Sequence, residues 1–329
     1  MGKRTYTYDG SSWVGLTSPA VSLDNYPNMT TASISGFRNA IINGDFRIWQ
    51  RGTSFTPSSS LIYTADRFFG YNSGNGSMTI SRQSFTPGNV ITGYEPQHYL
   101  RTAISSIGTS GYFNLGQRIE DVRTFAGQTV TVSFWMKSDA NRSVSGFVYQ
   151  SFGSGGSTAT TTTYGPFNVT TSWQRFTATI NLPSVSGKNI GSDSNLSVEL
   201  NLPASIQTTD IWGIQVEKGT LATPFEQRPV GTELALCQRY YQSGATISSG
   251  WAFYNSGAGD NLRGTNITLP FKVTMRSSPT ISVTAVSQDN FVLGSSWANA
   301  DFINAYVRAN LTGYPYGIGY ITYTAVSEL

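Results

Sequence analysis

Apolar and polar side chains alternate along this sequence in short segments that are separated by turn residues. In residues 127–137, one face of an extended strand would carry only apolar side chains: Val130, Val132, Phe134 and Met136. Further strands fit the segments 145–152, 173–182, 196–202 and 210–217. Because helical periodicity is almost absent, the sequence predicts an all-β protein whose first large unit is a jelly-roll β-sandwich.

A second β-rich unit follows beyond residue 244, with strands expected at 266–275, 280–286, 302–309 and 320–325. At roughly 150 residues per domain, a chain of 329 residues suggests about two domains. The sequence therefore predicts four parts: an extended N-terminal arm at 1–36, a jelly-roll domain at 37–230, a linker helix at 231–243 and a small C-terminal β-sandwich at 244–329.

The period changes once, near residue 232, where Leu234, Cys237 and Tyr241 fall on one stripe at helical spacing. Thr232 is the expected N-cap, and Glu233 would lie in the first turn, where the helix dipole favours a negative charge. On this stripe, Cys237 is expected to be a buried apolar side chain rather than a nucleophile.

The first 36 residues carry isolated aromatic residues among Thr, Ser, Gly and Pro. So few apolar groups cannot offset the entropy cost of ordering the segment alone. We interpret it as an attachment arm that becomes ordered by packing on another protein, the alternative being a disordered leader.

The residue inventory excludes several kinds of catalytic and metal site, because the sequence has one Cys and one His. The lone Cys237 cannot form an internal disulfide, and the lone His98 cannot supply a histidine cluster for zinc or iron. A Ser-His-Asp or Cys-His pair would have to include His98, which is expected in a loop, where a histidine is usually solvated.

The net charge and the hydropathy pattern indicate that the protein has neither a nucleic-acid nor a membrane partner. The 21 Lys and Arg residues against 18 Asp and Glu give a net charge of +3, and the basic residues are scattered singly. No apolar run approaches the roughly 18 residues of a membrane span, and the first ten residues lack the apolar region of a secretory signal. We expect a protein made in the cytoplasm that neither binds nucleic acid nor inserts into a membrane.

Motifs spread over residues 37–286 resemble those of jelly-roll modules in bacteriophage tail-fibre and related virion appendage proteins. In the first unit the similar segments are NAIINGDFRIWQRG at 39–52, TADRFF at 64–69, QRIE at 117–120, residues 127–137, SWQRF at 172–176 and GIQVEKG at 213–219. The most characteristic stretch is PFEQRP at 224–229, followed by ELALCQRYY at 233–241, and FKVTMRSSP at 271–279 matches the C-terminal domains of such proteins. The first domain also resembles the sandwich of carbohydrate-binding modules.

This resemblance implies a non-enzymatic structural protein of the virion, a tail fibre or related appendage on the outside of the particle. It would attach to tail or capsid proteins through the N-terminal arm and recognise a host cell-surface glycan. A homo-oligomer is implied as well, a trimer whose copies bind together. The alternatives are a fibre or decoration protein that contacts only virion proteins, a glycan-degrading spike and a secreted glycan-binding module.

Aromatic side chains are the candidate glycan contacts, since sugar recognition uses an aromatic platform beside amides, hydroxyls or carboxylates. In the first domain these are Trp135, Tyr149 and Tyr164. In the second domain they are Trp251, Tyr254, Tyr314 and Tyr316, in glycine-flanked loops. We expect the second-domain loops to carry the host contact, and the alternative for each ring is packing in the core or in a trimer interface.

A structural Ca²⁺ is the only cofactor that the sequence suggests, because Asp45, Asp210 and Glu217 flank the first and last strands of the predicted sandwich and carboxylates are suitable ligands. Ordinary turn-capping by these side chains is the alternative.

Glycan cleavage would require two cooperating carboxylates and no histidine. The adjacent Glu120 and Asp121 would point to opposite faces of a strand, and Glu217 and Glu226 are remote in the sequence. No catalytic pair can be chosen, and the sequence shows no internal repeat of the kind found in long β-helices. We therefore expect a protein that is not an enzyme.

Overall fold

A computed structural model describes residues 37–89, 91, 93–109, 111–251, 264–289, 291–309 and 317–329 of the chain. Before residue 37 it describes only β1 (Tyr6–Tyr8) and β2 (Trp13–Gly15), which pair antiparallel. The rest of the predicted attachment arm lies outside the described residues.

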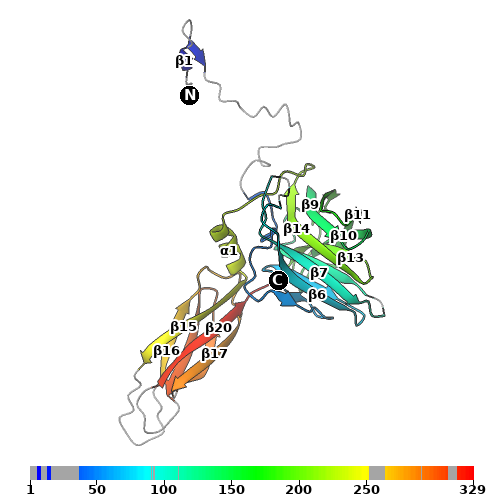
Figure 1. The fold of residues 1–329 in the computed structure, drawn as a ribbon. Coiled ribbons are helices and arrows are strands. Elements are labelled where there is room, and N and C mark those ends of the chain that lie inside the picture. Colours follow the sequence, from blue (N-terminus) through cyan, green and yellow to red (C-terminus); the bar gives the residue numbers. More distant parts are fainter. Residues whose placement is uncertain are drawn as a thin grey trace, which may run out of the picture.

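The largest unit is a sandwich of two six-stranded antiparallel sheets (Figure 1). Sheet I has the strand order β11-β10-β13-β8-β5-β4, and sheet II has the order β12-β9-β14-β7-β6-β3. The strands of sheet I are β4 (Ile62–Tyr63), β5 (Phe68–Asn72), β8 (Phe113–Glu120), β10 (Arg142–Ser151), β11 (Thr160–Val169) and β13 (Asn195–Leu202). Those of sheet II are β3 (Ser54–Phe55), β6 (Ser77–Ser84), β7 (His98–Ser106), β9 (Thr129–Ser138), β12 (Gln174–Asn181) and β14 (Gln207–Lys218). The predicted all-β sandwich is confirmed.

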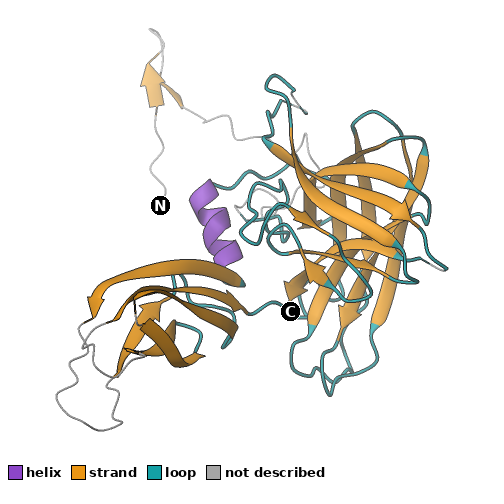
Figure 2. Cartoon of the chain, turned by 60° about the horizontal axis from the view of Figure 1, so that its bottom comes forward, coloured by secondary structure: helices purple, strands orange, loops and turns teal. Residues whose placement is uncertain are grey.

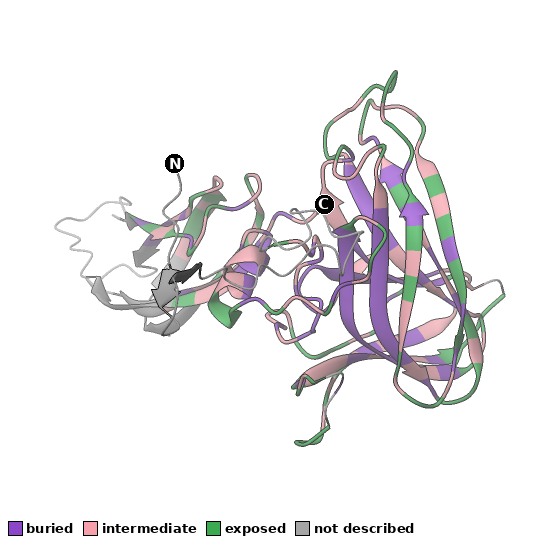
Figure 3. Cartoon of the chain, turned by 90° about the horizontal axis from the view of Figure 1, so that it is seen from above, coloured by how far each residue is buried: buried purple, intermediate pink, exposed green. Residues whose placement is uncertain are grey.

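The core lies between the two sheets and is built from the inward side of the alternation (Figure 3). Val130, Val132, Phe134 and Met136 of β9 are at most 1% exposed and belong to this core, as the pattern predicts. The opposite face of β9 is covered as well, since Trp135 is only 5% exposed. Sheet II therefore carries a second buried layer that alternation alone does not reveal.

The linker helix, α1 (Val230–Gln238), is shorter than predicted and begins earlier. Thr232 is not its N-cap: Pro229 occupies that position with a φ of −52°, and its carbonyl accepts the Glu233 N–H at 3.0 Å. Proline suits a helix start because its φ is fixed and its missing N–H would have no intrahelical partner. Tyr241 lies beyond the helix, whereas Cys237 is fully buried, as expected.

A smaller β unit follows α1 and contains two three-stranded antiparallel sheets. One has the order β15-β20-β17 and the other β16-β19-β18. Their strands are β15 (Tyr241–Trp251), β16 (Gly264–Pro270), β17 (Thr280–Asp289), β18 (Phe291–Ala298), β19 (Phe302–Ala309) and β20 (Gly317–Val326). Ile303, Ala305, Val307, Ile321 and Ala325 form its fully buried centre.

Buried charges join the two β units, between which α1 lies in Figure 2. The Glu328 carboxylate lies 2.8 Å from Arg51 and also pairs with Arg67, whose side chain is 1% exposed. The Arg67 guanidinium carbon lies 3.4 Å from the centroid of the Tyr240 ring. Charges that are removed from water in this way need their partners, so these contacts fix how the units meet.

Within the described part of the chain, α1 is too short and too polar to span a bilayer, and no other helix there meets that requirement.

Candidate functional site

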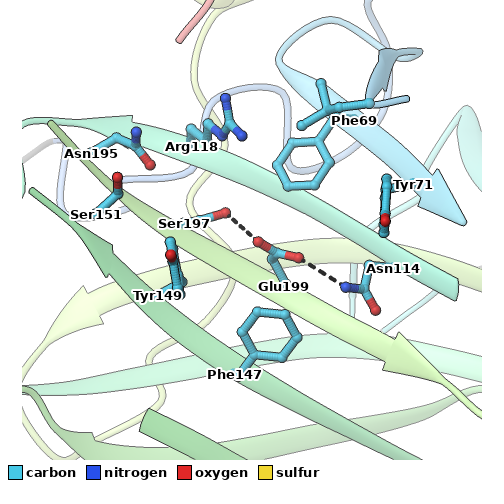
Figure 4. A pocket seen from close by; sticks show the side chains of 11 residues that line it. Phe69, Tyr71, Asn114, Arg118, Phe147, Tyr149, Ser151, Asn195, Ser197 and Glu199 are labelled. Carbon is cyan, nitrogen blue, oxygen red and sulfur yellow. Dashed lines mark hydrogen bonds between the residues drawn. The ribbon is translucent and has the colours of Figure 1, made fainter. Parts of the chain in front are cut away.

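A cavity of about 360 Å³ lies over the outer face of sheet I (Figure 4). Its lining comes from four neighbouring strands and from the residue before β4: Leu61, Phe69, Tyr71, Asn114, Arg118, Phe147, Tyr149, Ser151, Asn195, Ser197 and Glu199. This volume lies within the range of roughly 300–1,000 Å³ that is typical of small-molecule sites. We call it the sheet I cavity.

Strand register builds the centre of this cavity. Phe147 of β10 lies opposite Glu199 of β13, which lies opposite Gly116 of β8, which lies opposite Phe69 of β5. A Cβ at position 116 would lie 2.7 Å from Glu199 Cγ and 2.8 Å from Phe69 Cζ. Glycine is therefore required in this row, because it leaves the space that the carboxylate and the ring occupy.

A second row carries the ring that is most open to solvent. Tyr149 of β10 lies opposite Ser197 of β13, which in turn lies opposite Arg118 of β8. The Tyr149 side chain is 39% exposed. An aromatic ring and a guanidinium group thus stand on either side of a serine hydroxyl, on one face of the sheet.

Glu199 is the acidic group of the cavity. Ser197 Oγ donates a hydrogen bond of 2.7 Å to one of its carboxylate oxygens, and Asn114 Nδ2 donates one of 3.2 Å to the other. Burial raises the pKa of Glu199, an effect that these hydrogen bonds and the nearby Arg118 reduce. Asn114 Oδ1 is buried and has no donor among the described residues, so it can accept a hydroxyl of a ligand.

Arg118 connects the cavity to the smaller β unit. Its guanidinium group lies 5.5 Å from the centroid of the Phe69 ring, inside the cavity. The same group donates to the backbone carbonyl of Leu329, and Arg67 donates to the backbone carbonyl of Arg118. The position of this cavity wall therefore depends on the contact between the two units.

The structure separates the aromatic residues that the sequence nominated for glycan contact. Tyr149 lies in the sheet I cavity, whereas Tyr164 is 6% exposed and belongs to the sandwich core. The Tyr164 hydroxyl donates to the Glu199 backbone carbonyl at 2.9 Å, so this ring supports the cavity from beneath. Trp135 is in the buried layer on sheet II, with little of its ring exposed.

The candidates of the second domain fall where the structure gives little information. The backbone of Trp251 ends β15, and Tyr254, Tyr314 and Tyr316 lie outside the described residues. Glycan contact by these four rings stays a prediction.

The proposed Ca²⁺ ligands do not converge. Asp45 pairs with Arg47, and Asp210 pairs with Arg101 at 2.7 Å. Asp210 and Glu217 lie seven positions apart along β14, a span of about 23 Å in an extended strand. Glu217 accepts hydrogen bonds from the backbone N–H and the hydroxyl of the residue at position 223. Among the described residues, no group of three metal-ligating side chains is suitable for a metal ion.

The acidic residues considered for glycan cleavage are occupied with other partners. Glu120 pairs with Arg239 at 3.1 Å, and Asp121 pairs with Arg123 at 2.8 Å. Glu226 accepts hydrogen bonds from the backbone of residues 37–39.

The lone histidine and the lone cysteine occupy ordinary structural positions. His98 begins β7 instead of lying in a loop, and its Nδ1 is 3.3 Å from Ser84 Oγ. Burial lowers the pKa of His98 and raises that of the Cys237 thiol well above its usual value. A cysteine with a raised pKa is a poor nucleophile at neutral pH.

Several cavity residues were missed by sequence reasoning, which had found the strand at 196–202 but not its partners. Glu199, Ser197 and Asn114 were not nominated, because a polar residue on the outward face of a strand resembles an ordinary solvated position. The sequence did carry one signal for these positions. Ser197 and Glu199 alternate with the apolar residues of their strand, which places them on one face of the sheet, as Tyr149 is placed by the alternation in its own strand.

Comparison with solved structures gives distant matches to about half of the chain. Tailspike protein 4 of bacteriophage CBA120 aligns at 12% identity and a TM-score of 0.35, and the alignment covers 56% of this chain but only 22% of the tailspike chain. A putative sugar binding protein from Bacteroides thetaiotaomicron aligns at 12% identity and a TM-score of 0.35, covering 55% of this chain and 99% of that one. The CBM22-1 xylan-binding domain of Xyn10C from Paenibacillus barcinonensis aligns at 12% identity and a TM-score of 0.33, covering 51% and 95%.

A search of curated proteins found no match to the sequence. Comparison with family models, in contrast, assigns one segment. Apart from Leu61, Phe69 and Tyr71, every residue that lines the sheet I cavity lies within residues 100–205, the segment that matches the family model CBM_4_9, described as a carbohydrate binding domain.

Proposed function

We propose that the sheet I cavity binds a carbohydrate. The observation that carries this proposal is the half-exposed Tyr149 ring, which stands beside Glu199, Asn114 and Ser197 in a cavity built largely from the segment that matches a carbohydrate-binding family model. An aromatic face packs against the apolar face of a sugar ring, and the polar groups satisfy its hydroxyls.

Each polar group has a role that follows from its hydrogen-bonding capacity. The Glu199 carboxylate accepts from sugar hydroxyls in addition to its bonds from Ser197 and Asn114. Asn114 Oδ1 provides a further acceptor, and the Arg118 guanidinium provides donors at the other end. This combination of acceptors and donors is suited to a neutral sugar with several hydroxyl groups.

We propose binding without cleavage. Glycoside hydrolysis ordinarily uses two carboxylates that flank the bond, at about 5 Å for retention or further apart for inversion. Glu199 is the only carboxylate among the described residues that line the cavity.

Tyr149→Ala tests the proposal. We expect this variant to lose at least about tenfold in affinity for the glycan that a glycan array selects, because truncation to Ala removes the aromatic face on which the sugar ring would pack. Tyr112→Ala is the matched control, since Tyr112 is 63% exposed and does not line the cavity. Equal binding by the two variants in isothermal titration calorimetry would contradict the proposal.

We further propose, from the sequence resemblance, that the chain is an appendage protein on the outside of a phage particle. The N-terminal arm would attach to tail or capsid proteins, and a trimer would present several cavities to a host-surface glycan. Purified protein that fails to block adsorption of the phage to its host would favour the alternative, a structural protein that contacts only other virion proteins.

A further inference from the structure

A second cavity, of about 180 Å³, lies on the outer face of sheet II, on the opposite side of the sandwich from the sheet I cavity. Its walls include the rings of Tyr94, Trp135, Trp212 and Phe225, together with Arg175 and Gln227. Phe225 and Gln227 belong to the PFEQRP stretch, which the sheet I cavity does not use. We call it the sheet II cavity.

The aromatic walls hold one another in place. Trp212 packs against Trp135 with centroids 5.2 Å apart, against Phe225 at 5.1 Å and against Tyr94 at 5.3 Å. Trp212 is 1% exposed, so the cluster is a fixed part of the sandwich rather than a surface loop. A preformed aromatic wall of this kind binds a flat apolar face without first having to be ordered.

Arg175 brings a positive charge to this cavity. Its guanidinium carbon lies 4.7 Å from the centroid of the Trp135 ring, and its N–H groups reach Ser133 Oγ at 3.1 Å and the backbone carbonyl of Thr223. In the described part of the chain Arg175 forms no direct ion pair, and burial lowers its pKa, an effect that the nearby Glu217 reduces. Buried arginines are normally paired with carboxylates, so an anion would be stabilised here.

Two buried N–H groups of the lining residues also have no acceptor. These are Trp212 Nε1 and Arg175 Nε, neither of which has a hydrogen-bond partner among the described residues. A buried donor without an acceptor destabilises the folded protein, and a ligand oxygen that accepted from it would remove this cost. The donors, the cation and the absence of acidic side chains from the described lining all select for an acceptor-rich anion.

We propose that the sheet II cavity binds a hexuronate, a sugar ring that carries a carboxylate. The ring face would pack on Tyr94 and Phe225, the partly exposed rings of the lining, and the carboxylate would pair with Arg175. At about 180 Å³ the cavity is smaller than drug-sized sites, so it suits a single sugar ring. An adjacent cavity of about 290 Å³ contains Asp45 and Glu95 and is therefore less suited to an anion.

Titration of the full chain with D-glucuronate, D-glucose and acetate tests this proposal, with intrinsic tryptophan fluorescence as the readout. We expect saturable quenching by glucuronate, with at least about tenfold weaker effects of glucose and acetate, because each lacks one of the two recognised features. Quenching by glucose or acetate that equals that by glucuronate would overturn the proposal.

Variants of the lining residues test whether the fluorescence quenching comes from glucuronate in the sheet II cavity. Gln227→Glu adds a negative charge at an exposed lining residue and should weaken glucuronate binding about tenfold without affecting folding. Arg175→Gln should do the same, and Arg175→Lys should restore part of the affinity. If Arg175→Gln fails to fold, the result for Gln227→Glu decides, and undiminished affinity in that variant overturns the proposal.

Tyr149→Ala separates this inference from the proposed function. The variant removes the ring of the sheet I cavity, so it should retain glucuronate binding even if the sheet I cavity binds no glycan at all. Loss of glucuronate binding in this variant would place the sugar on sheet I and overturn the inference. A glucuronate-ended oligosaccharide, used in parallel, distinguishes a free sugar acid from the end of a glycan as the tighter ligand.

Discussion

At the scale of single residues, Glu199 shows how an acidic group of the sheet I cavity is held at some cost to folding. Its carboxylate lies between Phe69 and Phe147, with hydrogen bonds from Ser197 and Asn114 that only partly replace water. Because burial raises its pKa, the folded state binds the proton more tightly than the unfolded state does. Its contribution to stability is therefore present at low pH and is lost as pH rises through the raised pKa.

The Glu199→Gln variant tests this cost through the pH dependence of the unfolding free energy. Below the usual glutamate pKa, near 4.5, both side chains are neutral, and the unfolding free energies of variant and native protein differ by a constant amount. Above that pH the carboxyl ionises in the unfolded chain before it does in the folded protein, so the variant should gain stability relative to the native protein by about 1.4 kcal/mol for each unit of pKa shift. Urea unfolding at pH 4 and pH 7 measures this gain. If the difference in unfolding free energy between variant and native protein is the same at both pH values, burial does not raise the pKa of Glu199.

At the scale of elements, alternation within a strand could be read from the sequence, whereas pairing between strands could not. The inward residues of β9 follow from a pattern that is local to one strand. Glu199, Asn114 and Tyr149 meet because β13 pairs with both β8 and β10, and those partners are distant along the chain. No local pattern encodes such a register, so Tyr149 was found only because it is aromatic.

The start of α1 was mispredicted for a different reason. Thr232 has the side chain that favours N-caps, but the residues around Pro229 are held by a buried network instead. Arg228, which is 8% exposed, pairs with Glu233 at 3.1 Å and with Glu226 at 3.5 Å. Tertiary charge pairing thus decides where the helix begins, and the capping preference of Thr232 is overridden.

Arg228→Met tests this network. The substitution leaves Glu226 and Glu233 without their buried partner, and we expect a loss of about 3–5 kcal/mol in unfolding free energy. Arg123→Met is the matched control, because Arg123 is 61% exposed in its pair with Asp121 and should lose less than about 1 kcal/mol. Similar losses in both variants, measured by urea denaturation, would contradict a structural role for Arg228.

At the scale of the whole molecule, the two β units meet through charges that are withdrawn from water. Glu328 is 4% exposed and contacts both Arg51 and Arg67. Arg51 also lies over the Tyr241 ring at 3.9 Å, as Arg67 lies over Tyr240. One carboxylate from the smaller unit therefore pairs with two guanidinium groups of the sandwich, and the units should unfold together.

Glu328→Gln should uncouple them. With Arg51 and Arg67 left unpaired, we expect the single calorimetric transition to broaden or to split, with the smaller unit melting first. Asp193→Asn is the control, since it removes a pair with Arg276 across the same junction in which Asp193 is 66% exposed. A single, unshifted transition in the Glu328 variant would show that the junction does not depend on this carboxylate.

Arg118 gives this junction a mechanical consequence. The same guanidinium group forms a wall of the sheet I cavity and donates to the backbone of Leu329 in the smaller unit. A tensile load that draws the two units apart would act on this contact and, through the same side chain, on the cavity wall. The shape of the sheet I cavity and the attachment of the smaller unit are thus linked through one side chain, so stretching the molecule would displace a wall of the cavity.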